Sequence, residues 1–202
     1  MFAARKGYAD CVEMLASLEK ERKNSHGQTA LMEAANNGHS ECVQILAPLE
    51  QGTQDNEGKS ALMFAAKCGD ENSVRLLLDD EAGMKDSRGK TALMFAAVEG
   101  YAKCVNILLE KEKNMLDNDG HNARWHAIGG CKEILANVEE CMDCKDLFDA
   151  VDRGCEKCCK GFIDQAGTTT DDIYLGGMLC KGRTALMVAA YHGKTECVKT
   201  LA

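Results

Sequence analysis

The sequence predicts an all-α solenoid of stacked helix–turn–helix units joined by short loops. A motif of the form G-x-x-A-L-M-x-A-A recurs every 31 residues, beginning at Gly27, Gly58 and Gly89. Related copies begin at Gly120 (GHNARWHAI) and Gly182 (GRTALMVAA). A second glycine follows each strong start by eleven residues, and a Cys-Val step recurs fifteen residues on. Repeats of this length are typical of helical arrays in which each unit buries its apolar face against its neighbours.

The repeat divides the chain into the units of one array. Met1 has the phase of Met32 and Met63, so the chain opens inside a repeat. The stretch 120–181 is degenerate: if LFDAVDRGCEKCCKGFI aligns with LMFAAKCGDENSVRLLL, the fourth unit lacks the inter-helix turn before Cys131 and the fifth is long. The predicted units are 1–26 (partial), 27–57, 58–88, 89–119, 120–142 (short), 143–181 (long, degenerate) and 182–202 (truncated).

Each element of a unit follows from its residues. The run TALMFAA predicts a first helix, and a hydroxyl residue stands at each expected N-cap: Thr29, Ser60, Thr91 and Thr184. Pairs of alanines let helices approach closely, and the glycine eleven residues in permits a tight turn with positive φ. ECVQILAPL and AKCVNILLE predict a second helix. Polar runs such as EAGMKDSRG supply the turn residues that close the unit.

This pattern resembles the ankyrin repeat. The residues that carry the resemblance are G-x-T-A-L-M-x-A-A-x-x-G, then C-V-x-x-L-L, then D-x-x-G, over nearly the whole chain. Alanine and methionine replace the proline and histidine of the family pattern, and the unit has 31 residues instead of 33. The TALM style is similar to the large ankyrin-only family of Giardia-type parasites. The resemblance implies a curved stack with loops on one side and a concave binding face.

By the same resemblance, positions six, nine and ten residues after each repeat glycine face a partner. They are Glu33, Asn36, Asn37, Phe64, Lys67, Cys68, Phe95, Val98, Glu99, Val188, Tyr191 and His192, with His126 in the phase of Phe95. Phe64 and Phe95 form either an exposed aromatic pair or rings buried between first helices. Trp125, in the phase of the inward methionines, is predicted in the core. Loop-tip residues either contact a partner or form turns: Asp55, Asn56, Asp86, Arg88, Asn118 and Asp119.

Only four of the twelve cysteines have a spacing that suggests a metal site. Cys141, Cys144, Cys155 and Cys158 have the spacing of a four-thiolate zinc site. Cys158, however, has the phase of Cys11, Cys42, Cys104 and Cys197, where a small buried side chain explains the residue. A helix between the two pairs would also hold them about 15 Å apart. We therefore expect no metal, with zinc kept as the alternative. Cys68, Cys155, Cys159 and Cys180 are the expected exposed thiols.

No catalytic constellation is present in the sequence. There is no His-Glu-x-x-His, G-x-S-x-G or glycine-rich phosphate loop. The histidines His26, His39, His121 and His192 are expected as solvated turn residues, and His126 as a first-helix surface residue. We expect no enzymatic activity and no cofactor.

Composition and the absence of long apolar runs narrow the classes of partner that are expected. The formal net charge of −8 argues against nucleic acid, because phosphate backbones are bound by clustered Lys and Arg. No run of about 18 uncharged apolar residues and no signal peptide is present, so a cytoplasmic location without membrane insertion is expected. The leading hypothesis is a monomeric, non-enzymatic scaffold that binds protein partners. The alternative is a substrate-recognition tail or fragment of a larger protein, such as an ankyrin-containing protein kinase.

Overall fold

A computed structural model describes residues 1–18 and 22–138 continuously, and short segments at 169–170, 173–175, 178–180 and 183–184. The chain divides into two compact units, residues 1–139 and 140–202. The all-α stack of helix pairs predicted from the repeat is confirmed in the first unit.

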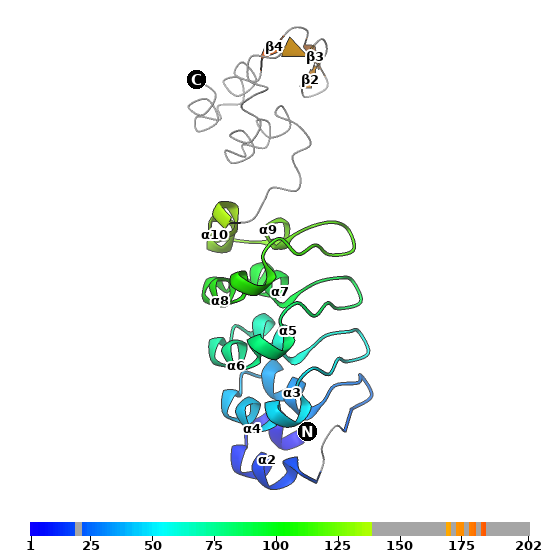
Figure 1. Cartoon of the computed structure of the whole chain (residues 1–202), viewed down its shortest axis with the longest axis vertical. Coiled ribbons are helices and arrows are strands. Elements are labelled where there is room, and N and C mark those ends of the chain that lie inside the picture. The colour runs from blue at the N-terminus through cyan, green and yellow to red at the C-terminus, as the bar shows by residue number, and fades with distance from the viewer. Residues whose placement is uncertain (19–21, 139–168, 171–172, 176–177, 181–182, 185–202) are drawn as a thin grey trace. The chain divides into compact units, whose positions relative to one another are not determined.

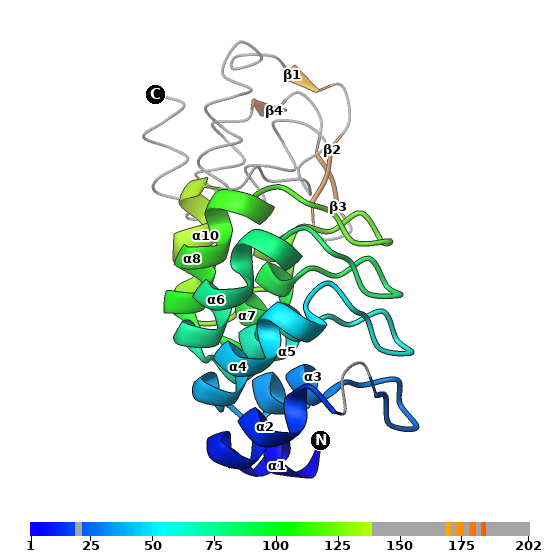
Figure 2. The same cartoon turned by 60° about the horizontal axis from the view of Figure 1, so that its bottom comes forward.

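Helix pairs one repeat apart stack side by side through residues 1–138, and the loops between pairs project to one side (Figures 1 and 2). The first helix of each pair contacts the first helix of the next, and second helices contact second helices. The pairs are α1 (Phe2–Lys6) with α2 (Ala9–Ala16), α3 (Ala30–Asn36) with α4 (Ser40–Glu50), α5 (Ala61–Cys68) with α6 (Glu71–Glu81), α7 (Ala92–Glu99) with α8 (Ala102–Glu112), and α9 (Ala123–His126) with α10 (Gly130–Val138).

The first helices begin where the sequence places their N-caps. Thr29, Ser60 and Thr91 have extended backbones and directly precede α3, α5 and α7. Only the Thr29 hydroxyl among these three accepts a capping hydrogen bond, from the Met32 N–H at 3.4 Å. Ser60 and Thr91 make no capping bond, so a different group must satisfy the first amides of α5 and α7.

That group is a buried glutamate from the second helix of the same pair. Oε2 of Glu81 accepts the Leu62 N–H at 2.7 Å, and Oε2 of Glu112 accepts the Leu93 N–H at 2.7 Å. Glu50 does the same for Leu31 at 2.8 Å. These glutamates recur every 31 residues and are almost fully buried. A carboxylate is well suited to the amide-rich start of a helix.

Two of these glutamates, Glu81 and Glu112, also connect neighbouring pairs. Oε1 of Glu81 accepts the Gly52 N–H, and Oε1 of Glu112 accepts the Gly83 N–H, each at 2.9 Å across a repeat junction. Burial raises the pKa of both Glu81 and Glu112, although the hydrogen bonds from backbone amides oppose that rise. Each carboxylate therefore links the loop of one unit to the first helix of the next.

Inter-helix glycines make close turns between the helices of a pair. Gly69 ends α5 with φ of 79°, as the sequence predicts. A Cβ added there would lie 2.7 Å from the ring of Tyr101, which packs over the turn from the next pair. The position therefore requires glycine for its backbone and for the space above it.

The core is built from the repeated apolar positions. It consists of Leu, Met and Ala of the first helices together with Val and Leu of the second helices. Cys42, Cys104 and Cys131 are buried, which confirms that this phase holds a small core side chain; Ser73 takes the same buried place in α6. Cys11 of α2 shares this phase but is exposed, so the expectation of a buried side chain is wrong for this residue.

The unit that begins at Gly120 has a shortened first helix, whereas the sequence placed the loss in the turn before Cys131. Helix α9 has 4 residues, whereas α7 has 8. The Ile128 N–H donates to the Ala97 carbonyl at 3.1 Å, which ties the shortened segment to the preceding pair. The prediction that Trp125 belongs to the core is wrong: the residue is 50% exposed. Its ring stacks on His121 instead of occupying the place that Met94 fills in α7.

The second compact unit contains two short antiparallel ladders among its described residues. β1 (Thr169–Thr170) pairs with β4 (Arg183–Thr184), with Thr169 opposite Thr184. β2 (Ile173–Leu175) pairs with β3 (Met178–Cys180), with Tyr174 opposite Leu179. Strands β1 to β3 lie in the predicted long unit 143–181, and β4 lies at the start of the unit predicted from 182; the sequence predicts no strands in either. The helix expected after Thr184 lies outside the described residues.

Candidate interaction surface

The outward edges of the first helices differ from unit to unit while the inward edges repeat. Asn36, Lys67 and Val98 share one phase, differ in chemistry, and are all exposed. Asn37 and Glu99, one position on, are exposed as well. By contrast, Leu and Met at the inward positions are buried in α3, α5 and α7 alike.

The remaining predicted contact residues are less accessible. Glu33 is half-buried, and its Oε1 accepts a hydrogen bond from the Asn24 amide at 3.2 Å. Phe64 is only 6% exposed, and Phe95 is half-buried against the core. The two rings therefore do not form an exposed aromatic pair, because Phe64 is buried and Phe95 is only partly accessible. Cys68, expected as an exposed thiol, is half-buried beside Gly38.

Each loop is folded around one aspartate or asparagine. Oδ1 of Asp55 accepts the Glu57 and Lys59 amides at 2.9 and 2.8 Å. Asp86 and Asp117 bond the equivalent amides of their own loops, and Asn24 does so in the first loop. Turn formation thus accounts for Asp55 and Asp86 among the predicted loop-tip residues.

Neighbouring loops lie side by side (Figure 2) and are hydrogen-bonded to one another. The Asn56 N–H donates to the His26 carbonyl, and the Asn118 N–H to the Arg88 carbonyl, each at 3.0 Å. The side-chain amides of Asn56 and Asn118 add bonds to Ser25 and Ser87 carbonyls of the preceding loop. This ladder makes the loops one continuous platform beside the first helices.

The fourth loop carries a cluster that sequence reasoning missed. Nε2 of His126 lies 2.7 Å from Oδ2 of Asp117, and the His121 ring stacks on Trp125 with centroids 4.2 Å apart and planes 5° apart. Burial alone would raise the pKa of Asp117, but hydrogen bonds from the His121 amide, His126 and the Asp119 amide outweigh it and lower the pKa. His126 is thus held by Asp117 instead of standing free on the surface.

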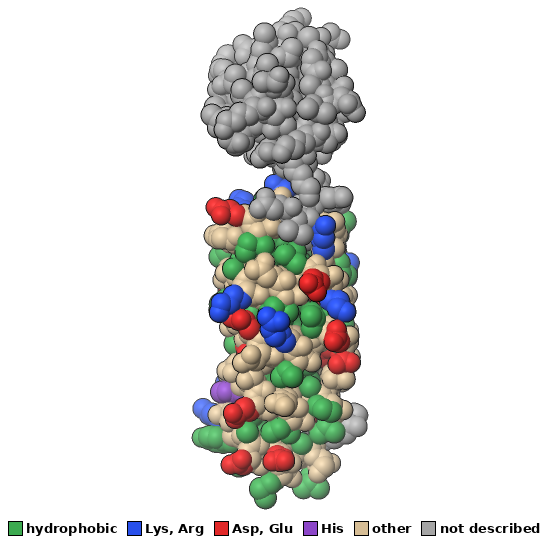
Figure 3. All heavy atoms as spheres, turned by 60° about the vertical axis from the view of Figure 1, so that its left-hand side comes forward, with side chains coloured by type: hydrophobic (Ala, Val, Ile, Leu, Met, Phe, Trp, Pro, Cys, Tyr) green, Lys and Arg blue, Asp and Glu red, His purple; other side chains and the backbone are tan. Residues whose placement is uncertain are grey.

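The second-helix side has a different character (Figure 3). Acidic and basic side chains are interspersed there, with Lys103 2.9 Å from Glu71 and Lys111 3.3 Å from Asp79 across the groove between α6 and α8. Exposed pairs of this kind contribute little stability. No single-sign charge patch is visible over the described residues of this face.

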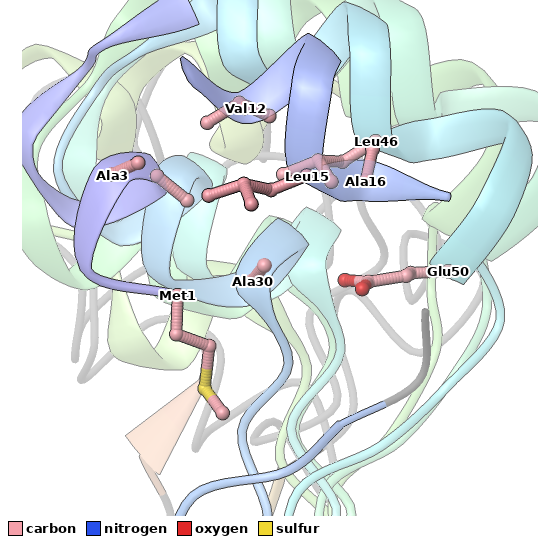
Figure 4. Close-up of a pocket in the computed structure, with 9 residues that line it drawn as sticks. Met1, Ala3, Val12, Leu15, Ala16, Ala30, Leu46 and Glu50 are labelled. Atoms are coloured by element: carbon pink, nitrogen blue, oxygen red, sulfur yellow. The ribbon is translucent and has the colours of Figure 1, made fainter. Parts of the chain in front are cut away.

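An apolar hollow lies between the first two helix pairs (Figure 4). Its lining includes Met1, Val12, Leu15, Leu46 and Glu50. The enclosed space is about 20 Å³, roughly what one water molecule needs. This hollow is therefore not a ligand site.

Several predicted residues lie outside the described part of the chain. From the predicted surface they are Val188, Tyr191 and His192, and from the zinc alternative Cys141, Cys144, Cys155 and Cys158. Among the expected exposed thiols they are Cys155 and Cys159. For Cys180 the structure describes the backbone, in β3, but not the exposure of the thiol.

The comparisons with known families agree with this architecture. The family model described as ankyrin repeats (3 copies) matches residues 1–85 and 79–143, and the single ankyrin-repeat model matches residues 181–202. The chain therefore belongs to the ankyrin-repeat family. Its repeats form a protein–protein interaction module of a kind that is generally non-enzymatic. No curated protein matches the chain. Among the described helices none is long and apolar enough to cross a membrane.

Proposed function

We propose that this chain is a non-enzymatic scaffold that binds protein partners through the first-helix edges and the loop platform. One observation carries the proposal: Asn36, Lys67 and Val98 occupy one phase of the array, are all exposed, and differ in charge and polarity. The buried positions beside them are nearly invariant between units. An array with a fixed core and varied exposed residues presents a row of independent contact points.

Rigidity supports the same proposal. The loops are braced internally by their aspartates and externally by the loop-to-loop bonds, and the buried glutamates tie each loop to the next first helix. A surface that is already ordered loses little conformational entropy when a partner binds. We further propose that the protein is a monomer in a reducing compartment such as the cytoplasm, which would keep the described cysteines as free thiols.

The test compares the two sides of the array. Asn37→Arg and Val98→Arg alter the first-helix side, whereas Gln44→Arg and Asn106→Arg place the same charge at exposed positions of second helices. A partner is identified by cross-linking and mass spectrometry with the wild-type protein, and its affinity for each variant is then measured by titration. The expected result is a loss of tenfold or more for the first-helix variants only. Loss confined to the second-helix variants would refute the proposed surface.

A further inference from the structure

The loop at residues 117–121 differs in charge from the two loops before it. Three equivalent positions are Asp55, Glu57 and Lys59 in one loop, Asp86, Arg88 and Lys90 in the next, and Asp117, Asp119 and His121 in this one. In the first of these loops the Lys59 ammonium lies 2.6 Å from Glu57 and supplies the cation. The 117–121 loop has two carboxylates, as the Asp55 loop has, but it carries an imidazole in the position where both preceding loops have a lysine.

The three side chains of this loop converge. One carboxylate oxygen from each of Asp117 and Asp119 and one ring nitrogen of His121 all lie within 4.8 Å of one another. Nδ1 of His121 is 3.9 Å from Oδ1 of Asp117. The turn itself holds this arrangement, because Oδ1 of Asp117 accepts the backbone amides of Asp119 and His121 at 3.0 and 2.8 Å.

Two neighbouring side chains fix the orientation of this cluster. His126 bonds Oδ2 of the nearly buried Asp117 at 2.7 Å, and Trp125 stacks on the His121 ring. Neither contact has a counterpart in the preceding two units, where Phe64 and Phe95 stand in the phase of His126. Hydrogen bonds to a ligating side chain commonly set its orientation and strengthen metal binding.

We propose that this loop binds a divalent transition-metal ion of the Zn²⁺ class, with Asp117, Asp119 and Nδ1 of His121 as ligands. His126 acts as a positioning residue for the Asp117 carboxylate. An imidazole with two carboxylates favours Zn²⁺ and similar ions over Mg²⁺ and Ca²⁺, which prefer oxygen donors alone. The ion would occupy the place where the Asp55 loop holds the ammonium of Lys59.

Trp125 gives a local reporter for the test. It is the single tryptophan of the chain and is stacked on the proposed ligand His121. The full-length protein is titrated with Co²⁺, whose unpaired electrons quench nearby fluorescence, and then with Zn²⁺ in competition. We expect saturable quenching that Zn²⁺ reverses and that excess Mg²⁺ or Ca²⁺ does not. A thiolate-to-cobalt absorption band would report binding at cysteines separately.

The variants borrow residues from the equivalent loops, so that folding is preserved. Asp119→Arg and His121→Lys introduce the residues found at Arg88 and Lys90, and His126→Phe introduces the residue found at Phe95. Asp119→Arg and His121→Lys should abolish saturable quenching, and His126→Phe should weaken binding by about tenfold or more. His26→Gln changes an exposed loop histidine of an earlier unit and should have no effect.

Three results would overturn the proposal. Wild-type protein could show no saturable quenching up to millimolar Co²⁺, or Asp119→Arg, which leaves the His121–Trp125 stack in place, could bind as tightly as the wild type. Reversal of the quenching by Mg²⁺ as readily as by Zn²⁺ would also refute the assigned class of ion. Far-UV circular dichroism of each variant confirms that a lost signal reflects lost binding and not unfolding.

Discussion

Replacing Glu81 by alanine should weaken the junction between the first two complete repeats. The Glu81 side chain is 1% exposed, and its two oxygens accept the Leu62 and Gly52 amides at 2.7 and 2.9 Å. Leu62 lies in the first turn of α5, and Gly52 lies in the loop that follows α4 of the preceding repeat. Alanine would leave both amides without this acceptor and would open a cavity between the repeats.

The structure sets the size of the effect. A hydrogen bond to a charged group contributes about 1.5–3 kcal/mol, so two such bonds correspond to about 3–6 kcal/mol. Removing a buried carboxylate also returns its desolvation cost, which is the cost that raises the pKa of Glu81. The expected net loss in free energy of unfolding is therefore about 2–4 kcal/mol. Glu81→Gln keeps one good acceptor and should lose about half as much.

Urea unfolding followed by far-UV circular dichroism measures the loss, and hydrogen exchange with mass spectrometry locates it. Peptides that contain Leu62 and Gly52 should exchange faster in Glu81→Ala, because their amides lose the carboxylate. Glu110→Ala is the control, since Glu110 is exposed on α8 and should change stability by less than about 0.5 kcal/mol. If Glu81→Ala also changed stability by less than about 0.5 kcal/mol and left both peptides protected, the reasoning would be refuted.

Three further changes test other parts of the array. In thermal or urea unfolding, Gly89→Ala should lower the free energy of unfolding by about 1–3 kcal/mol more than Gly52→Ala does. Both glycines have positive φ (77° and 78°). An added Cβ at Gly89 would lie 2.6 Å from a backbone nitrogen of the next loop, whereas one at Gly52 would meet open space. Equal costs would show that backbone strain alone matters. Burial raises the pKa of the Cys104 thiol to about 11, so Cys104 should react with a maleimide far more slowly than the exposed Cys11. Labelling at pH 8 followed by peptide mass spectrometry measures both rates. Similar rates would contradict the described packing. The pKa of Glu112 is raised in the folded state, so on acidification the folded protein takes up a proton before the unfolded chain does. The free energy of unfolding of the wild type, measured by urea titration relative to Glu112→Gln, should therefore increase as the pH falls through that raised pKa toward 4.5. A difference that shrinks on acidification would mean that the carboxylate is better solvated than the structure indicates.

The buried glutamates show what sequence reasoning could have found but did not. Glu50, Glu81 and Glu112 keep the 31-residue phase, as the core leucines do. A charged residue that recurs in phase at the end of an apolar helix indicates that its side chain has a buried hydrogen-bonding partner in the tertiary structure. Methionine stands in this chain where the family pattern has histidine, and the buried carboxylates supply the acceptors for the first amides of α5 and α7.

The fourth unit shows where sequence phase misleads. Trp125 has the phase of the buried methionines, yet α9 ends after 4 residues and the ring lies over His121. Phase assigns a position on a regular helix, and a helix shortened to one turn no longer follows the repeat. Asp117 and His126 are nine residues apart, so their contact at 2.7 Å depends on how the loop returns to the helix.

The sequence by itself determined the ankyrin architecture, the core positions and the inter-helix glycines, because these depend on local periodicity and on backbone conformations that recur in every unit. Only the tertiary structure decided which exposed residues are available, since Phe64 and Phe95 share a phase and a residue type but differ in burial. It also decided that buried carboxylates join the repeats and that two histidines gather around Asp117. Those features arise between units, where the distance between two side chains depends on how the helix pairs and loops pack.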